Sequence, residues 1–155
     1  MATSVVAFNF PNPVLTPPAT LNEPPCYATI RKMQTELNAN AASVHSNAGN
    51  GVHGYLILTM IQAEYLNVTG SDVEFEVPKN PTLAPDHSDD STAVHFNETN
   101  RQHKEDQLIF KTFHDLDRAL CKLILEATPL VFLRALNDPD LGFGNVTCLQ
   151  LLYHL

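Results

Sequence analysis

Apolar residues recur at spacings of three and four residues in three stretches of the sequence, which is the pattern of an amphipathic helix. The first stretch, CYATIRKMQTELNANAASV, places Ile30, Met33 and Leu37 on one face and polar residues on the opposite face. Pro25 suits the first turn of a helix, and the SNAGNG that follows supplies residues that tolerate left-handed backbone. The pattern therefore predicts a helix over residues 25–45 with these three apolar side chains in the core.

The second stretch begins near residue 90, where Ser91 or Thr92 is suited to cap a helix, and it continues to Pro129, which interrupts it. Charged residues occupy one face of its C-terminal half, and apolar residues occupy the other. The predicted core residues of this helix are Leu108, Ile109, Phe113, Leu116, Leu120 and Leu123. After a break near Thr128, the stretch LVFLRAL predicts a short apolar helix that NDPDLGFG ends.

The third stretch, LGFGNVTCLQLLYHL, closes the chain and carries a capping box, in which Thr147 precedes Gln150 by three residues. The Thr147 hydroxyl is expected to accept from the backbone N–H of Gln150, while the Gln150 side chain reaches back to Thr147. A helix therefore begins here, with Leu149 and Leu152 in the core. Because the chain stops without a C-terminal cap for this helix, we expect the helix to continue in a longer protein.

The remaining segments have less regular patterns. YLILTMIQAEYL predicts an apolar turn and then a short helix that Gly70 terminates, although YLILTM alone also suits a short buried strand. Residues 71–90 hold three prolines and six acidic residues and predict a long exposed acidic loop, with an extended piece at VEFEV as an alternative. Six prolines among the first 25 residues predict an extended arm over residues 1–24. The expected fold is all-α, a bundle of four to five helices over residues 25–155 that follows this arm.

Charge narrows the range of partners. The 155 residues suffice for one domain with a core, and 17 acidic against 9 basic residues give a formal net charge of −8. Such a surface repels phosphates of nucleic acids and anionic lipids, so neither nucleic acid nor membrane is expected as a direct partner. The N-terminus has no basic region and is interrupted by Pro11 and Pro13, which argues against a signal peptide. A cytoplasmic location is therefore expected.

Candidate chemistry is sparse. Cys26, Cys121 and Cys148 form no Cys-x-x-Cys pair, and free thiols, buried or half-buried, are their expected state. His103 and His114 are eleven residues apart, and no His-Glu-x-x-His motif places two histidines one helical turn apart, as a metal site requires. We expect no catalytic residue, metal site or cofactor. An enzyme that uses Cys26 or Cys121 with a histidine remains an alternative, which ordinary thiol reactivity would exclude.

Three stretches together point to a known family: RKMQTELNANAASVHSNAGNGVHGYLILTM, ETNRQHKEDQLIFKTFHDLDRALCKLILEATP and LGFGNVTCLQLLYHL. They resemble the N-terminal capsid region of the Gag polyprotein of copia-type LTR retrotransposons, in particular the copies found in algal and protist genomes. The resemblance runs from about residue 24 to the end of the chain, and its motifs are packing patterns and helix caps.

The resemblance implies a non-enzymatic helical domain that packs with copies of itself into a virus-like particle, as one part of a longer Gag-Pol polyprotein. In the family, RNA is held by a basic segment further along the polyprotein, and this division agrees with the acidic charge of the chain. The alternative is a domesticated Gag-derived helical adaptor that binds a partner peptide or helix in an apolar groove.

Overall fold

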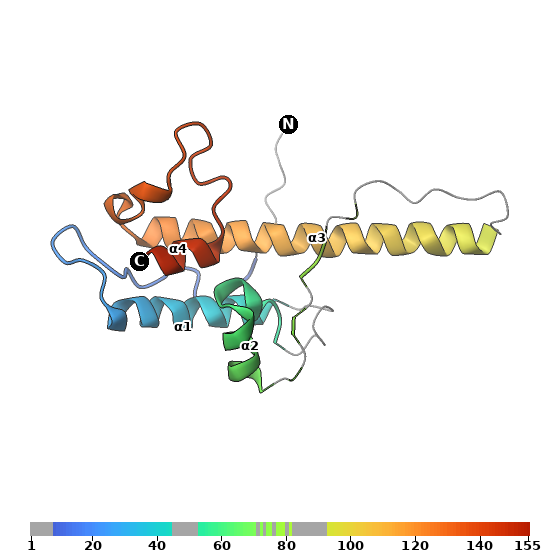
Figure 1. Ribbon diagram of the computed structural model, residues 1–155, viewed down its shortest axis with the longest axis horizontal. Helices are drawn as coiled ribbons and strands as arrows, with labels where there is room; N and C mark the ends of the chain where they lie inside the picture. The colour runs from blue at the N-terminus through green and yellow to red at the C-terminus, as the bar shows by residue number, and fades with distance from the viewer. Residues whose placement is uncertain are drawn as a thin grey trace.

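The computed structural model describes residues 8–44, 53–70, 72, 74–75, 77–79, 81 and 93–155, without the side chains of residues 93, 95 and 96. Within this part of the chain the α-helices are α1 (Tyr27–Ser43), α2 (Gln62–Thr69), α3 (Ala93–Ala127) and α4 (Cys148–His154), with short 3-10 segments between them. The predicted all-α fold is confirmed. In Figure 1, α3 lies along the longest axis of the molecule, and α1 and α4 lie beside its C-terminal half.

A single hydrophobic core joins α1, α3 and α4. Met33 and Leu37 of α1 are fully buried, and α1 runs in the opposite direction to α3 (Figure 1). Leu116 and Leu120 of α3 are also fully buried, one helical turn apart. The four-residue spacing places them on one face, and that face packs against α1 and α4.

The chain enters η2 (Leu56–Thr59) through a close approach to the C-terminal end of α1. Gly54 has a φ of +57°, and a Cβ at this position would lie 2.6 Å from the carbonyl oxygen of Val44. The next residue, Tyr55, donates its backbone N–H to the carbonyl oxygen of Ala41 at 3.0 Å. Glycine at position 54 therefore allows the loop to supply a hydrogen bond to the end of α1.

The apolar turn and short helix predicted from YLILTMIQAEYL are both present. All four residues of η2 are buried, and α2 follows it. Gly70 ends α2 in the left-handed conformation, with φ of 68° and ψ of 15°. Its position and its role as a helix terminator were predicted from the sequence alone.

Phe75 departs from the exposed loop expected over residues 71–90. Its side chain is 2% exposed, because the ring packs against the rings of Tyr55 and Tyr65. The side-chain amide of Gln62 satisfies the backbone here: it accepts from the N–H of Phe75 at 3.1 Å and donates to its carbonyl oxygen at 2.8 Å. Most of residues 71–90, and the proposed caps Ser91 and Thr92, lie outside the described residues.

Several predicted core residues occupy the positions expected of them, and others do not. Met33, Leu37, Leu116, Leu120 and Leu152 are buried, and Phe113 and Leu123 are half-buried against the core. Leu108 was predicted wrongly, because it is 63% exposed and does not belong to the core cluster. Ile30, Ile109 and Leu149 are half-buried and do not belong to the core cluster.

The stretch LVFLRAL does not form the α-helix that we predicted. It forms two 3-10 turns, η3 (Leu130–Phe132) and η4 (Arg134–Leu136), and only Leu133 between them is buried. Pro129 has no N–H to donate, and Pro139 follows ten residues later. The segment between them is too short for the hydrogen bonds of an α-helix to offset the free-energy cost of nucleating one. The predicted break of α3 near Thr128 is confirmed.

Candidate functional site

The described part of the N-terminal arm lies on α1 and is held there by side chains of that helix. Asn40 of α1 is fully buried, and its amide pairs with the backbone of Asn12. Its Oδ1 accepts from the N–H of Asn12 at 2.9 Å, and its Nδ2 donates to the carbonyl oxygen of Asn12 at 2.8 Å. This reciprocal pair recognises extended backbone in the way that a neighbouring β-strand would.

Glu36, one turn before Asn40, provides a second point of attachment. Its carboxylate accepts from the backbone N–H of Thr16 at 2.9 Å and from the Thr16 hydroxyl at 3.3 Å. Its carbonyl oxygen also accepts from Nδ2 of Asn12 at 3.3 Å. We call Glu36 and Asn40 the arm-binding surface of α1, and residues 8–19 the bound segment.

Apolar side chains of the bound segment enter the same core as the helices. Leu15 and Ala19 are 2% and 6% exposed, and Pro18 is fully buried. Phe8 and Phe10 stack on one another with ring centroids 5.6 Å apart and pack against the core. The arm is thus part of the folded unit, and α1 satisfies both backbone polar groups of Asn12 and the N–H of Thr16.

A second set of side-chain contacts joins α4 to α3. Asp117 of α3 accepts from the backbone N–H of Cys148, the first residue of α4, at 3.0 Å, and Cys121 donates its thiol proton to the carbonyl oxygen of Val146. Between them lies the predicted capping box: Thr147 Oγ1 accepts from the N–H of Gln150 at 3.2 Å, and Gln150 Oε1 accepts from the N–H of Thr147 at 2.9 Å. The N-terminus of α4 is therefore capped both from within and from α3.

The environment of this junction controls the protonation of its groups. Burial raises the pKa of Asp117, against the N–H of Cys148 and the positive charges of His114 and Arg118, which lower it. Burial also raises the pKa of Cys121 to about 12, and Asp117 adds to the effect. Thiols in such surroundings stay protonated at neutral pH and are weak nucleophiles.

The three cysteines occupy contrasting positions, and all are free. Cys121 and Cys148 are buried, and burial raises the pKa of Cys148 well above its ordinary value. Cys26 is exposed at the start of α1, where hydrogen bonds from Thr29 lower its pKa. The structure places Cys26 on α1 and Cys121 on α3, and it shows no contact of either with a histidine among the described residues.

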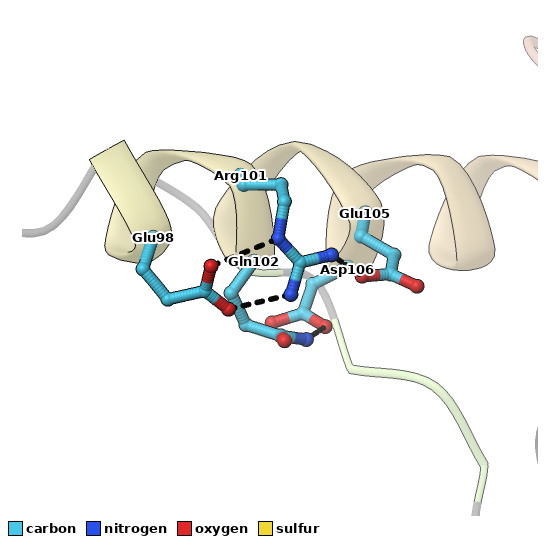
Figure 2. Close-up of polar contacts among 5 residues, drawn as sticks. All are labelled: Glu98, Arg101, Gln102, Glu105 and Asp106. Carbon is cyan, nitrogen blue, oxygen red and sulfur yellow. Dashed lines mark hydrogen bonds and ion pairs between the residues drawn. The ribbon is translucent and has the colours of Figure 1, made fainter. Parts of the chain in front are cut away.

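The N-terminal half of α3 extends beyond the other described helices (Figure 1), and we call Ala93–Thr112 the projecting half. Figure 2 shows how its polar side chains pair along the helix: Arg101 donates to both oxygens of Glu98 and to Glu105 at 3.0 Å, and Gln102 donates to Asp106 at 2.9 Å. These pairs span three or four residues, the spacing that brings side chains together on a helix. They stabilise the helix locally and leave no unpaired charge at Arg101.

Large apolar side chains remain exposed on several elements. They are Val14, Leu21, Tyr27, Ile61, Val68, Val77, Val94, Leu108, Leu130, Val131, Leu141 and Tyr153. Leu108 and Val94 belong to the projecting half, and Val77 lies between α2 and α3. The others are distributed over the arm, α1, α2 with its N-cap, η3 and the C-terminal region. The described residues include no group of three or more histidine, cysteine, aspartate and glutamate side chains suited to a metal ion.

Sequence reasoning missed the arm-binding surface, although one signal for it was present. Asn40 lies three residues after Leu37, on the apolar face of α1, where a polar residue must find a partner. The partner is the backbone of residue 12, and no local pattern in the sequence indicates that pairing.

Comparison with models of known protein families found no match, and the comparisons with curated proteins and with solved structures also found none. Among the described residues, no helix combines the length and the apolar character needed to cross a bilayer. The structure itself therefore establishes the fold class.

Proposed function

We propose that this chain is a structural, non-enzymatic capsid domain of a copia-type Gag polyprotein, and that it packs with copies of itself into a virus-like particle in the cytoplasm. One observation carries the proposal. The three stretches that resemble the Gag family contain most of the residues of the core cluster, in α1 with η2, in α3, and in the C-terminal segment with α4. The segments that resemble the family are thus segments that pack together in one helical domain.

Weak contacts repeated many times are the expected mode of assembly. Exposed apolar side chains occur singly on several elements, and such contacts gain strength when copies are repeated across a shell. The net charge of −8 opposes association of copies at low ionic strength. Assembly should therefore increase with salt, which screens the repulsion between acidic surfaces.

Light scattering after size exclusion and electron microscopy test the proposal on the chain itself and on any longer product of the same reading frame. We expect oligomers or particles whose yield rises with ionic strength. A longer product that stays strictly monomeric at all concentrations, salt levels and pH values would contradict the capsid proposal.

A second candidate, a helical adaptor that binds a peptide, is favoured by the arm-binding surface. Glu36 and Asn40 already hold an extended segment, largely through its backbone. An adaptor of this kind would remain monomeric and would bind an extended peptide of another protein at this surface in place of residues 8–19. Monomeric behaviour together with such binding would favour the adaptor over the capsid domain.

A further inference from the structure

The arm-binding surface recognises features that another copy of the chain also carries. Asn40 forms hydrogen bonds with the N–H and carbonyl oxygen of residue 12, and Glu36 accepts from the N–H and hydroxyl of Thr16. Leu15 supplies the apolar anchor between these two points and is almost fully buried. We propose that this surface also binds the bound segment of a second copy, so that two copies exchange their N-terminal arms.

The connection between the bound segment and α1 favours exchange. Residues 20–24 are exposed and Pro25 is half-buried, and the hydrogen bonds of this connecting segment join Thr20 and Glu23 in a local turn. Opening the turn therefore sacrifices no contact of the core. Pro24 and Pro25 fix their own φ angles and bias the preceding residue toward extended backbone, so the opened segment is already close to the extended form that an exchange requires.

Symmetry favours a second copy as the partner. In an exchanged pair each arm occupies the arm-binding surface of the other copy. Each contact between arm and surface in the single chain is then made twice, once in each direction, and no new kind of contact is needed. Within one chain, a short connection holds the arm near its own surface at about millimolar effective concentration. Exchange therefore becomes competitive where copies are concentrated, as they are in an assembling shell; in this respect the inference rests on the proposed self-assembly.

Shortening the connecting segment provides the first test. Deletion of residues 20–23 removes the turn and leaves the stiff Pro24–Pro25 directly after Ala19, so the arm is unable to fold back on its own α1. We expect this variant to have twice the mass of its own single chain in solution, with the amides of residues 12–16 still protected from hydrogen exchange. The matched control replaces residues 20–23 with a Gly/Ser linker of equal length and should remain monomeric under the same conditions.

A monomeric deletion variant would overturn the proposal, whether its arm is released and unprotected or still bound to its own α1. If the deletion prevents folding, a second test decides. Leu15→Asp disables the arm of one copy and leaves its surface intact, whereas Asn40→Leu disables the surface of another copy and leaves its arm intact. Mixed together, these two variants should form heterodimers by native mass spectrometry, whereas each one alone should not.

The control for the arm variant is Leu21→Asp, because Leu21 is 80% exposed in the connecting segment and contacts no part of the core cluster. Leu21→Asp mixed with Asn40→Leu should give the same yield of heterodimer as wild type mixed with Asn40→Leu. That yield should be lower than with Leu15→Asp, because the intact arm of Leu21→Asp still occupies its own surface. A mixture of Leu15→Asp and Asn40→Leu that contains only monomers would overturn arm exchange.

These outcomes separate the inference from the proposed function. Particles built from copies whose arms all stay on their own α1 would leave the capsid proposal intact and overturn arm exchange. Exchanged dimers that never assemble further would support arm exchange and contradict the capsid proposal.

Discussion

The two halves of α3 belong to one continuous helix and are stabilised in different ways. From Phe113 onward, α3 contributes to the core, with Leu116, Leu120 and Ile124 fully buried against neighbouring elements. Among the described side chains, those of the projecting half contribute none to the core cluster, and Figure 2 shows side-chain pairs along its surface. Burial supports one half, and pairing between neighbouring turns supports the other.

Formal charge differs little between the halves, since residues 113–127 hold three acidic and two basic residues. The projecting half carries three acidic and three basic residues, so its formal charge is balanced, although the whole chain has a net charge of −8. A helical segment that is not packed against other elements depends on side-chain pairs three or four residues apart, and isolated helices shorter than about 12–15 residues are marginal in water. The comparison shows that a continuous helix need not have uniform stability, and that local opening should begin in the projecting half.

The largest expected effect comes from truncating the same residue type in each half. Leu120→Ala removes a fully buried side chain and should lower the free energy of unfolding by about 2–5 kcal/mol, since it leaves a cavity. Leu108→Ala, the matched change on the projecting half, should lower it by less than about 0.5 kcal/mol. Urea unfolding measures both, and equal losses would show that an interaction covers Leu108 in solution.

The capping box tests the junction that fastens α4 to the packed half. Thr147→Ala removes the hydroxyl that accepts from the N–H of Gln150, and it should cost about 1 kcal/mol of unfolding free energy. Thr147→Ser keeps the hydroxyl and should retain most of the stability. Chemical denaturation of both variants measures the effect, and an equal loss for the two would show that the cap contributes little.

Asp117 gives the packed half a distinctive dependence on pH. Because burial raises its pKa in the folded state, the folded protein binds the proton more tightly than the unfolded chain does, so stability rises as pH falls through the folded pKa of Asp117. Asp117→Asn keeps an acceptor for the N–H of Cys148 and removes the buried charge. It should be at least as stable as the wild type at neutral pH, with an advantage that shrinks on acidification.

Denaturation curves at several pH values measure this difference. Asp115→Asn is the control for the change of charge, because Asp115 belongs to a surface pair with Lys111. An advantage of Asp117→Asn that grows as the pH falls would mean that the folded state lowers the pKa of Asp117.

The smallest effect on global stability is expected at the centre of the projecting half. Arg101→Gln removes the pairs with Glu98 and Glu105, and these exposed pairs contribute little to the unfolding of the whole molecule. It should nevertheless accelerate hydrogen exchange of amides in residues 94–108 while those of residues 113–127 stay unchanged. Lys122→Gln on the packed half, where the pair with Glu126 is 3.9 Å long, should alter neither region.

The local patterns of the chain determined which segments are helical and where several of them end. The periodicity around Met33 and Leu37 placed α1, and the spacing of Thr147 and Gln150 identified the cap of α4 residue by residue. Gly70 was recognised as a terminator for the same reason. These features depend on interactions within three or four residues, and such interactions are visible in the sequence.

Tertiary structure decided which periodic residues are covered and which are not. Leu108 continues the apolar pattern of α3 and yet is exposed, because the neighbouring elements cover only the C-terminal half of the helix. Phe75 lies in an acidic, proline-containing segment and yet is buried against the rings of Tyr55, which precedes η2, and Tyr65 of α2. The docking of the arm, through pairs that are 20 to 28 residues apart, likewise exists only in the folded molecule. Burial depends on which elements meet in space, and the local pattern of a helix does not contain that information.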